Sequence, residues 1–296
     1  MKKIFTTLFA TFMIAAQVMA VNVHDVCGRF DGNMIVGGDY YDNRSIYLLP
    51  GVEENTVTLV LPDFTTSYNE LGDIVLPNIP MDENGLLHLE NARLYFKSIA
   101  EAASITLFNG LEDEGTTYNS VLSETDAMVV LSIVAPSLPE PIFVLFTGTN
   151  ARTTVDPDNT ELVYNRDLKS FTRNGEVLTF SNNIANIDTV YSDSCATYVA
   201  EVNDISAKTF TAFDTTHKCI FIYVIADDYA QTGIYNIYRV DFTDSDAEGL
   251  GPKEGQQTGI ETITIGNASF EKVLIEGQFF IRRNDALYNA SGVRVR

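Results

Sequence analysis

Histidine and carboxylate side chains are the groups of this chain that would carry metal chemistry, and the sequence has 3 His and 40 Asp plus Glu. His24, His88 and His217 stand far apart and share none of the short spacings that bring two imidazoles to one zinc ion. Seen alone, the run from His217 to Cys219 would suit a metal, but no second ligand pair accompanies it. These spacings predict no zinc site.

Alternating carboxylates after residue 243 imitate the start of a calcium-binding loop. Asp244, Asp246 and Glu248 alternate, and Gly249 would allow the sharp turn. Gly255 occupies the position at which such a loop has its bidentate glutamate. We therefore interpret this stretch as a solvated linker and predict neither a metal nor a cofactor.

Patterns for covalent catalysis are missing from the sequence. No Gly-x-Ser-x-Gly elbow presents a serine, and no glycine-rich phosphate loop follows a predicted strand. Pairs of carboxylates for glycoside hydrolysis could be chosen from the 40 acidic residues in too many ways to indicate a site. We predict that the protein is not an enzyme.

Three cysteines, Cys27, Cys195 and Cys219, make an odd number. Cys195 and Cys219 fall in one β-rich segment, where a disulfide could close a modest loop. Alternatively, all three are small buried apolar residues, which is a common role of free cysteine.

Tyrosines are the remaining side chains that could recognise a ligand, because they offer apolar area with a polar tip. Tyr40 and Tyr41 follow the turn at Gly37 to Asp39, a position that favours binding. The alternative is ordinary packing on a sheet, where tyrosine is favoured. The same choice applies to four tyrosines later in the chain: Tyr223, Tyr229, Tyr235 and Tyr238.

Strands must position these side chains. Residues 56–64 and 71–80 are two short strands separated by Pro, Gly and Asn, with Val57, Leu59 and Leu61 expected on one face and Thr56 and Thr58 on the other. This period of two predicts a half-buried sheet. Further strands are expected at 33–36, 45–49, 86–97, 104–108, 127–135 and 141–147, with turn residues between them. Regular spacing of this kind favours an antiparallel barrel or sandwich.

Charge and length limit the classes of partner. The 296 residues carry a formal charge of -21, which would repel a polyanion, so nucleic-acid binding is excluded. A hydrophobic content of 45% is enough for one or two domains with proper cores.

The first 20 residues have the order of a secretory signal peptide. Lys2 and Lys3 precede an apolar run from Ile4 to Ala16, and Val18 to Ala20 provide small residues at the expected cleavage point. Beyond it, no apolar run approaches the ~20 residues of a membrane-spanning helix. We predict an exported protein, found in the periplasm, on the outer cell surface or outside the cell, with no transmembrane helix in the mature chain.

Residues 26 to 148 resemble the bacterial calycin-like domain, a family of secreted β-barrels related in architecture to lipocalins. The matching segments are Phe30 to Val36, Asn55 to Phe64 and Leu71 to Pro80. The resemblance implies a cupped barrel and supplies no catalytic residues.

A second β-rich segment follows a polar stretch at Asp156 to Asn159, with strands expected at 176–181, 195–202, 208–213, 219–226 and 234–242. The C-terminus, with its Gly259-Ile260-Glu261 start and its Tyr288-Asn289 end, resembles the short form of the sorting domain of type IX secretion cargo. The plainer alternative is a pair of strands docked on the preceding domain. We thus expect an all-β chain: signal peptide 1–20, calycin-like barrel 21–150, second domain 151–243, linker 244–259 and sorting-like tail 260–296.

Two functions compete. In the first, the exported barrel holds a small apolar or amphipathic molecule, with Tyr40, Tyr41, Leu59 and Val144 as candidate contacts. In the second, the barrel is filled by its own side chains, and the protein is a cell-surface interaction or adhesion module. The tail would contact the cell surface or the secretion machinery in either case.

Overall fold

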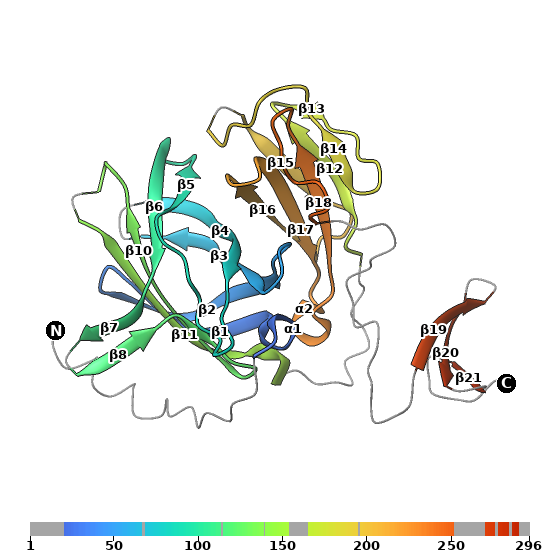
Figure 1. The fold of residues 1–296 in the computed structure, drawn as a ribbon, viewed down its shortest axis with the longest axis horizontal. Coiled ribbons are helices and arrows are strands. Elements are labelled where there is room, and N and C mark those ends of the chain that lie inside the picture. The colour runs from blue at the N-terminus through green and yellow to red at the C-terminus, as the bar shows by residue number, and fades with distance from the viewer. Residues whose placement is uncertain are drawn as a thin grey trace.

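The computed structural model describes residues 21–66, 69–113, 115–138, 140–153, 165–194 and 196–251, and three strands between 270 and 289. Two bodies of β-structure lie side by side, a barrel and a second unit (Figure 1). The second unit comprises the described residues from 165 to 251. The prediction of an all-β chain is confirmed. Among the described residues, no helix is long and apolar enough to cross a membrane.

A single antiparallel sheet of nine strands forms the barrel, in the order β4-β3-β2-β1-β11-β10-β6-β5, with β9 paired to β10. Its strands are β1 (Gly28–Val36), β2 (Asp39–Pro50), β3 (Thr56–Thr65), β4 (Glu70–Pro80), β5 (Ala92–Phe96), β6 (Glu101–Leu107), β9 (Val121–Leu122), β10 (Asp126–Val134) and β11 (Ile142–Asn150). The short helix α1 (Val23–Val26) and Cys27 pack into the same core. Of the strand expected over 86–97, only β5 forms.

The register of β2, β3 and β4 sorts their side chains into two rows. Leu48, Leu59 and Leu76 are paired across the three strands and point into the barrel core. Tyr47, Val60 and Val75 are paired in the same way on the outer face, and all three are buried. The prediction of a half-buried sheet was therefore wrong for the outer face, because another layer covers it.

Strands β1 and β11 approach closely at Gly32. A Cβ atom at this position would meet the backbone oxygen of Thr147 and the Cα atom of Gly148. The β1–β2 pairing also shifts its register between Gly32 and Met34, as at a β-bulge. Glycine is required here because only a residue without a side chain lets the two backbones come this close.

A hairpin covers part of the barrel wall, although the sequence predicted no strands in that region. Strands β7 (Asn109–Asp113) and β8 (Thr116–Asn119) pair with each other on either side of Gly115. Tyr118 of β8 packs with Met128 and Val130 on the outer face of β10. This contact explains why β10 is apolar on both faces.

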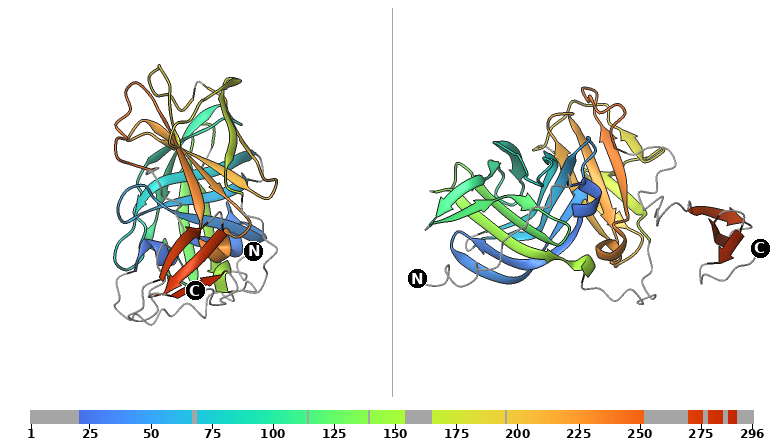
Figure 2. Two further views of the ribbon diagram at one scale, coloured as in Figure 1. Left: turned by 90° about the vertical axis from the view of Figure 1, so that its right-hand side faces the viewer. Right: turned by 60° about the horizontal axis from the view of Figure 1, so that its bottom comes forward.

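The second unit has two layers. A four-stranded sheet, in the order β14-β18-β17-β16, lies against the barrel, and a three-stranded sheet, β13-β12-β15, covers its other face (Figures 1 and 2). Its strands are β12 (Leu168–Arg173), β13 (Glu176–Val177), β14 (Ile184–Asn186), β15 (Tyr198–Val202), β16 (Lys208–Asp214), β17 (Cys219–Ile225) and β18 (Tyr235–Asp241), with helix α2 (Tyr229–Thr232) before β18. Strands β12 and β14 were not expected from the sequence.

Strand β17 is the centre of the second unit. All seven residues from Cys219 to Ile225 are buried, as expected of a strand with a layer on each side. In β18, Tyr235 and Ile237 face the barrel, whereas Tyr238 and Val240 face the outer layer. The strand expected at 234–242 thus forms, and its successive side chains alternate between the two layers.

The second unit also crosses the open seam of the barrel. Strands β4 and β5 are the two edge strands of the sheet. Their Cα atoms come within 8 Å of each other, but among the described residues the two strands are not paired by backbone hydrogen bonds. Arg93 of β5 pairs with Asp193 at 3.1 Å, and Lys97 Nζ donates to the Ala196 carbonyl at 2.7 Å. In β4, the Asn78 amide donates to Asp214 at 2.9 Å. Both sides of the seam are therefore tied to the second unit by polar contacts.

Part of the expected linker is folded onto the second unit. The buried guanidinium of Arg239 donates to the carbonyl oxygens of Ala247 and Leu250, which holds the chain against β18. Further on, strands β19 (Phe270–Ile275), β20 (Gln278–Arg283) and β21 (Ala286–Asn289) form a three-stranded antiparallel sheet. The predicted signal peptide and the Gly259-Ile260-Glu261 start of the tail lie outside the described residues.

Candidate functional site

The barrel interior is filled by side chains. Leu59 and Val144, two predicted ligand contacts, are fully buried in the core together with Phe30 and Phe146. Two cavities lined by barrel residues, one under the β3–β4 and β10–β11 turns and one between β1, β2 and β3, each measure about 10 Å³. This is roughly the space of one water molecule, far below the roughly 300–1,000 Å³ of a ligand pocket.

Tyr40 and Tyr41 do not share a pocket. Tyr40 is 52% exposed on the outer wall, opposite Ile35 of β1. Tyr41 points the other way, packs against the barrel core and lies under the Arg44 guanidinium at 5.2 Å. The four residues predicted to contact a ligand are therefore not brought together. Leu59 and Val144 lie in the core, Tyr41 packs at the edge of the core, and Tyr40 is on the surface.

The cysteines lie in the core where described. Cys27 and Cys219 are both buried, and burial raises the pKa of each thiol far above the usual range. Neither has the low-pKa setting of a nucleophile. Cys195 lies outside the described residues, so its pairing with Cys219 stays a prediction.

Tyrosines instead gather at the junction between the barrel and the second unit. The Tyr229 hydroxyl donates to the Leu48 carbonyl at 2.6 Å, and Tyr223 shares a hydrogen bond of 3.1 Å with Thr58. Burial raises the pKa of both hydroxyls above the ordinary value, so both act as neutral phenols. These tyrosines pack and hydrogen-bond inside the protein, which agrees with sheet packing rather than ligand stacking.

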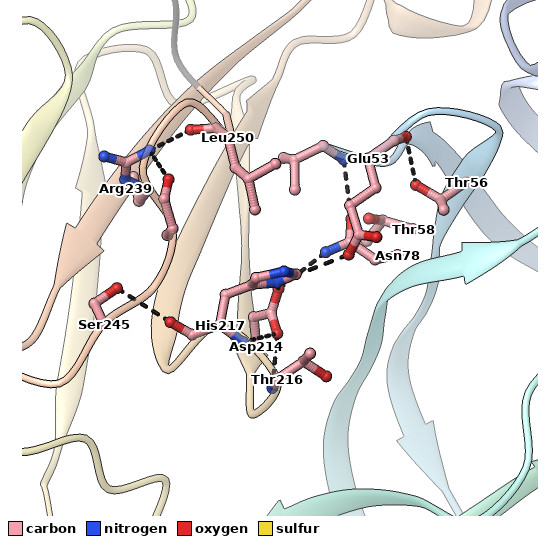
Figure 3. Close-up of polar contacts among 12 residues, drawn as sticks. Glu53, Thr56, Thr58, Asn78, Asp214, Thr216, His217, Arg239, Ser245 and Leu250 are labelled. Atoms are coloured by element: carbon pink, nitrogen blue, oxygen red, sulfur yellow. Dashed lines mark hydrogen bonds and ion pairs between the residues drawn. The ribbon is translucent and has the colours of Figure 1, made fainter.

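A polar cluster lies at the edge of this apolar junction (Figure 3). Glu53 comes from the β2–β3 loop, Asn78 from β4, Asp214 from the end of β16 and His217 from the β16–β17 turn. His217 Nδ1 lies 2.9 Å from Asp214 Oδ2 and 3.7 Å from Glu53 Oε1. Two β units that are separate in sequence thus meet at one imidazole.

The turn after β16 holds the cluster in place. Asp214 Oδ1 accepts from the backbone N–H groups of Thr216 and His217, at 2.9 and 3.0 Å, as in an Asx turn. Lys218 has a φ of 53°, which completes the reversal into β17. On the barrel side, Asn78 Oδ1 accepts from the Val52 N–H at 2.9 Å and positions the loop that carries Glu53.

The cluster is rich in negative charge. The Asp214 side chain is 4% exposed, His217 is 19% exposed and Glu53 is 42% exposed. Within the described part of the chain, neither carboxylate forms an ion pair with a lysine or arginine. One carboxylate oxygen from each acid and one imidazole nitrogen lie within 4.8 Å of one another, a set that could hold a metal ion.

A polar cleft adjoins this cluster and has a volume of about 410 Å³. It lies between the β2–β3 loop, the N-terminal end of the described chain and β18, and Glu53 belongs to both cleft and cluster. His24 and Glu54, both exposed, also line the cleft.

No family model, curated protein or solved structure matches this chain. The fold class and the nearly closed barrel agree with the expected architecture. The calycin-like and sorting-domain resemblances gain no support from the comparisons and remain proposals.

The sequence patterns missed the cluster at Glu53. His217 and Asp214 are three residues apart, but Glu53 and Asn78 belong to the other β unit. The one local signal was the run from Asp214 to His217, with an acid and an imidazole at either end of a tight turn. Its barrel-side partners could be found only from the packing of the two units.

Proposed function

We propose that this protein is an exported, non-enzymatic interaction module that binds its partner through its outer surface. The packed barrel interior carries the proposal, because side chains such as Phe30, Leu59 and Phe146 occupy the space that a ligand would need. The signal-peptide pattern and the sorting-like tail support export and delivery to the cell surface. We propose in addition that the barrel is a calycin-like domain.

The outer wall of the barrel offers a surface for such contacts. Tyr40, Phe143 and Val134 are each about half exposed, at 52%, 50% and 48%. The pairing of β1, β2, β10 and β11 places them on one face, with Ile35 and Leu145 between Tyr40 and Phe143. Half-exposed aromatic and aliphatic groups in one patch are typical of interaction surfaces.

Native mass spectrometry of the protein purified from its own host tests the absence of an enclosed ligand. We expect the mass of the mature chain alone in every preparation, and no small molecule in a solvent extract. A reproducible additional mass that is released by solvent would contradict the proposal and favour the competing function, a barrel that holds an apolar molecule.

Larger side chains in the core distinguish a filled barrel from one that holds a ligand. Leu59→Phe and Val144→Phe each add volume to a site with no free space, and we expect each to lower the free energy of unfolding by about 1–3 kcal/mol. Denaturant unfolding measures this effect. Val190→Phe is the matched control, since Val190 is 66% exposed, and it should change stability little. Stability equal to the wild type in both core variants would indicate room in the barrel and would sink the interaction-module proposal.

A further inference from the structure

The cluster of Glu53, Asp214 and His217 has the composition of a metal site rather than of a surface ion pair. It supplies one imidazole nitrogen and two carboxylate oxygens from two packed β units, and these atoms lie within 4.8 Å of one another (Figure 3). Ligands around a tetrahedral zinc ion lie ~2.0–2.2 Å from the metal and therefore ~3.4 Å from one another. The separations of Nδ1 from the two oxygens, 2.9 and 3.7 Å, lie on either side of that value.

The charges in the cluster call for a cation. Two carboxylates face one imidazole, and Asp214 is almost fully buried. Buried carboxylates are stabilised by a paired cation or by a bound metal. The nearby basic groups are engaged with other acids, Lys218 with Asp244 and Arg239 with Asp241. Among the described residues, His217 is the one basic side chain within 4.0 Å of either acid.

The surroundings also match those of a metal site. The Asn78 amide donates to Asp214 Oδ2, the same oxygen that faces His217, and thereby orients it. Glu53 also lines the cleft of about 410 Å³, so this ligand of the cluster faces an open, partly polar space that can hold water.

We propose that Glu53, Asp214 and His217 bind a divalent transition metal ion of the zinc class. An imidazole ligand favours such an ion over Mg²⁺ or Ca²⁺, which take oxygen ligands. Binding replaces the contact between His217 Nδ1 and Asp214 and requires Nδ1 without its proton, so a proton is released when the ring carries it there. The ion would join the β2–β3 loop of the barrel to the β16–β17 turn of the second unit.

Calorimetric titration of Zn²⁺ into the untagged full chain, after chelator treatment, tests the site. We expect one ion per chain, a thermal midpoint that rises with the free Zn²⁺ concentration, and with Co²⁺ a visible absorption spectrum typical of a four-coordinate ion. Glu53→Gln and His217→Ala should each weaken binding by about 100-fold or more.

Two variants of the same cleft are the matched controls. Glu54→Gln and His24→Ala remove a carboxylate and an imidazole that line the cleft outside the cluster, and binding should stay within about 3-fold of wild type. Circular dichroism checks the fold of each variant. Because Glu53 is 42% exposed, Glu53→Gln is expected to fold and suffices alone if His217→Ala does not. Wild-type affinity in Glu53→Gln, or no Zn²⁺ binding by the wild type, would overturn the proposal.

Discussion

Tyr229→Ala is expected to lower the free energy of unfolding of the chain by about 3–5 kcal/mol, the usual cost of removing a buried aromatic ring. Tyr229 is 1% exposed, its ring lies 6.4 Å from that of Tyr47, and its hydroxyl donates to the Leu48 carbonyl. The substitution therefore removes packing and a hydrogen bond where the barrel meets the second unit. Denaturant unfolding measures the loss, and native-state hydrogen exchange of the β2 amides shows whether the two units separate more often.

Phe171→Ala is the matched control for this effect. Phe171 is also fully buried, but it lies in the cluster on the other face of β17 and β18, away from the barrel. It should cost similar stability while leaving the local exchange of β2 unchanged. Equal exchange of β2 in both variants would show that Tyr229 does not couple the two units.

Asp228→Ala is expected to lower the free energy of unfolding by about 3–5 kcal/mol, because it removes the carboxylate that faces the buried Arg166 guanidinium. Asp228 and Arg166 form an ion pair whose side chains are 1% and 11% exposed. Asp228 also accepts a hydrogen bond from the Thr232 hydroxyl in α2. Thermal or denaturant unfolding at neutral pH measures the effect.

Replacing both partners should be far less costly than replacing one. Burial raises the pKa of Asp228 above its usual range, although Arg166 opposes this shift. A carboxyl whose pKa is higher in the folded state stabilises the fold below its unfolded pKa, and this contribution is lost as the pH rises through the folded pKa. Burying the charged form of this carboxyl is therefore a net cost, even with Arg166 beside it. Arg166→Met with Asp228→Leu should unfold within about 1 kcal/mol of wild type or above it. A double variant as unstable as Asp228→Ala would contradict this account.

The alternation of apolar residues was enough to predict most of the barrel. In β3, Val57, Leu59 and Leu61 recur with a period of two, and they face the core as expected. Gly and Asn residues indicated where the turns lie, because both tolerate the left-handed conformation that Asn55, Asn174 and Asn183 adopt. Both signals depend only on residues that are neighbours in the sequence, so they can be recognised without knowledge of the packing.

What covers the outer faces could not be predicted, because it depends on contacts between distant segments. Thr58 was expected on the outer face of β3, yet it forms a hydrogen bond with Tyr223, and Val60 on the same face packs in the same cluster as Tyr223. The hairpin β7–β8 and the short strand β14 have too few alternating residues to be recognised. For the same reason, nothing near His217 in the sequence indicated Glu53.

The buried outer row of Tyr47, Val60 and Val75 has a consequence for the order of folding. All strands of the barrel precede the second unit in the chain, so the barrel ladders can form before β16, β17 and β18 exist to cover that row. During that interval the wall presents apolar side chains to water, which is a hazard for aggregation. The second unit shields these side chains from water only once it has folded, so a chain cut after β11 would leave the apolar row of Tyr47, Val60 and Val75 exposed.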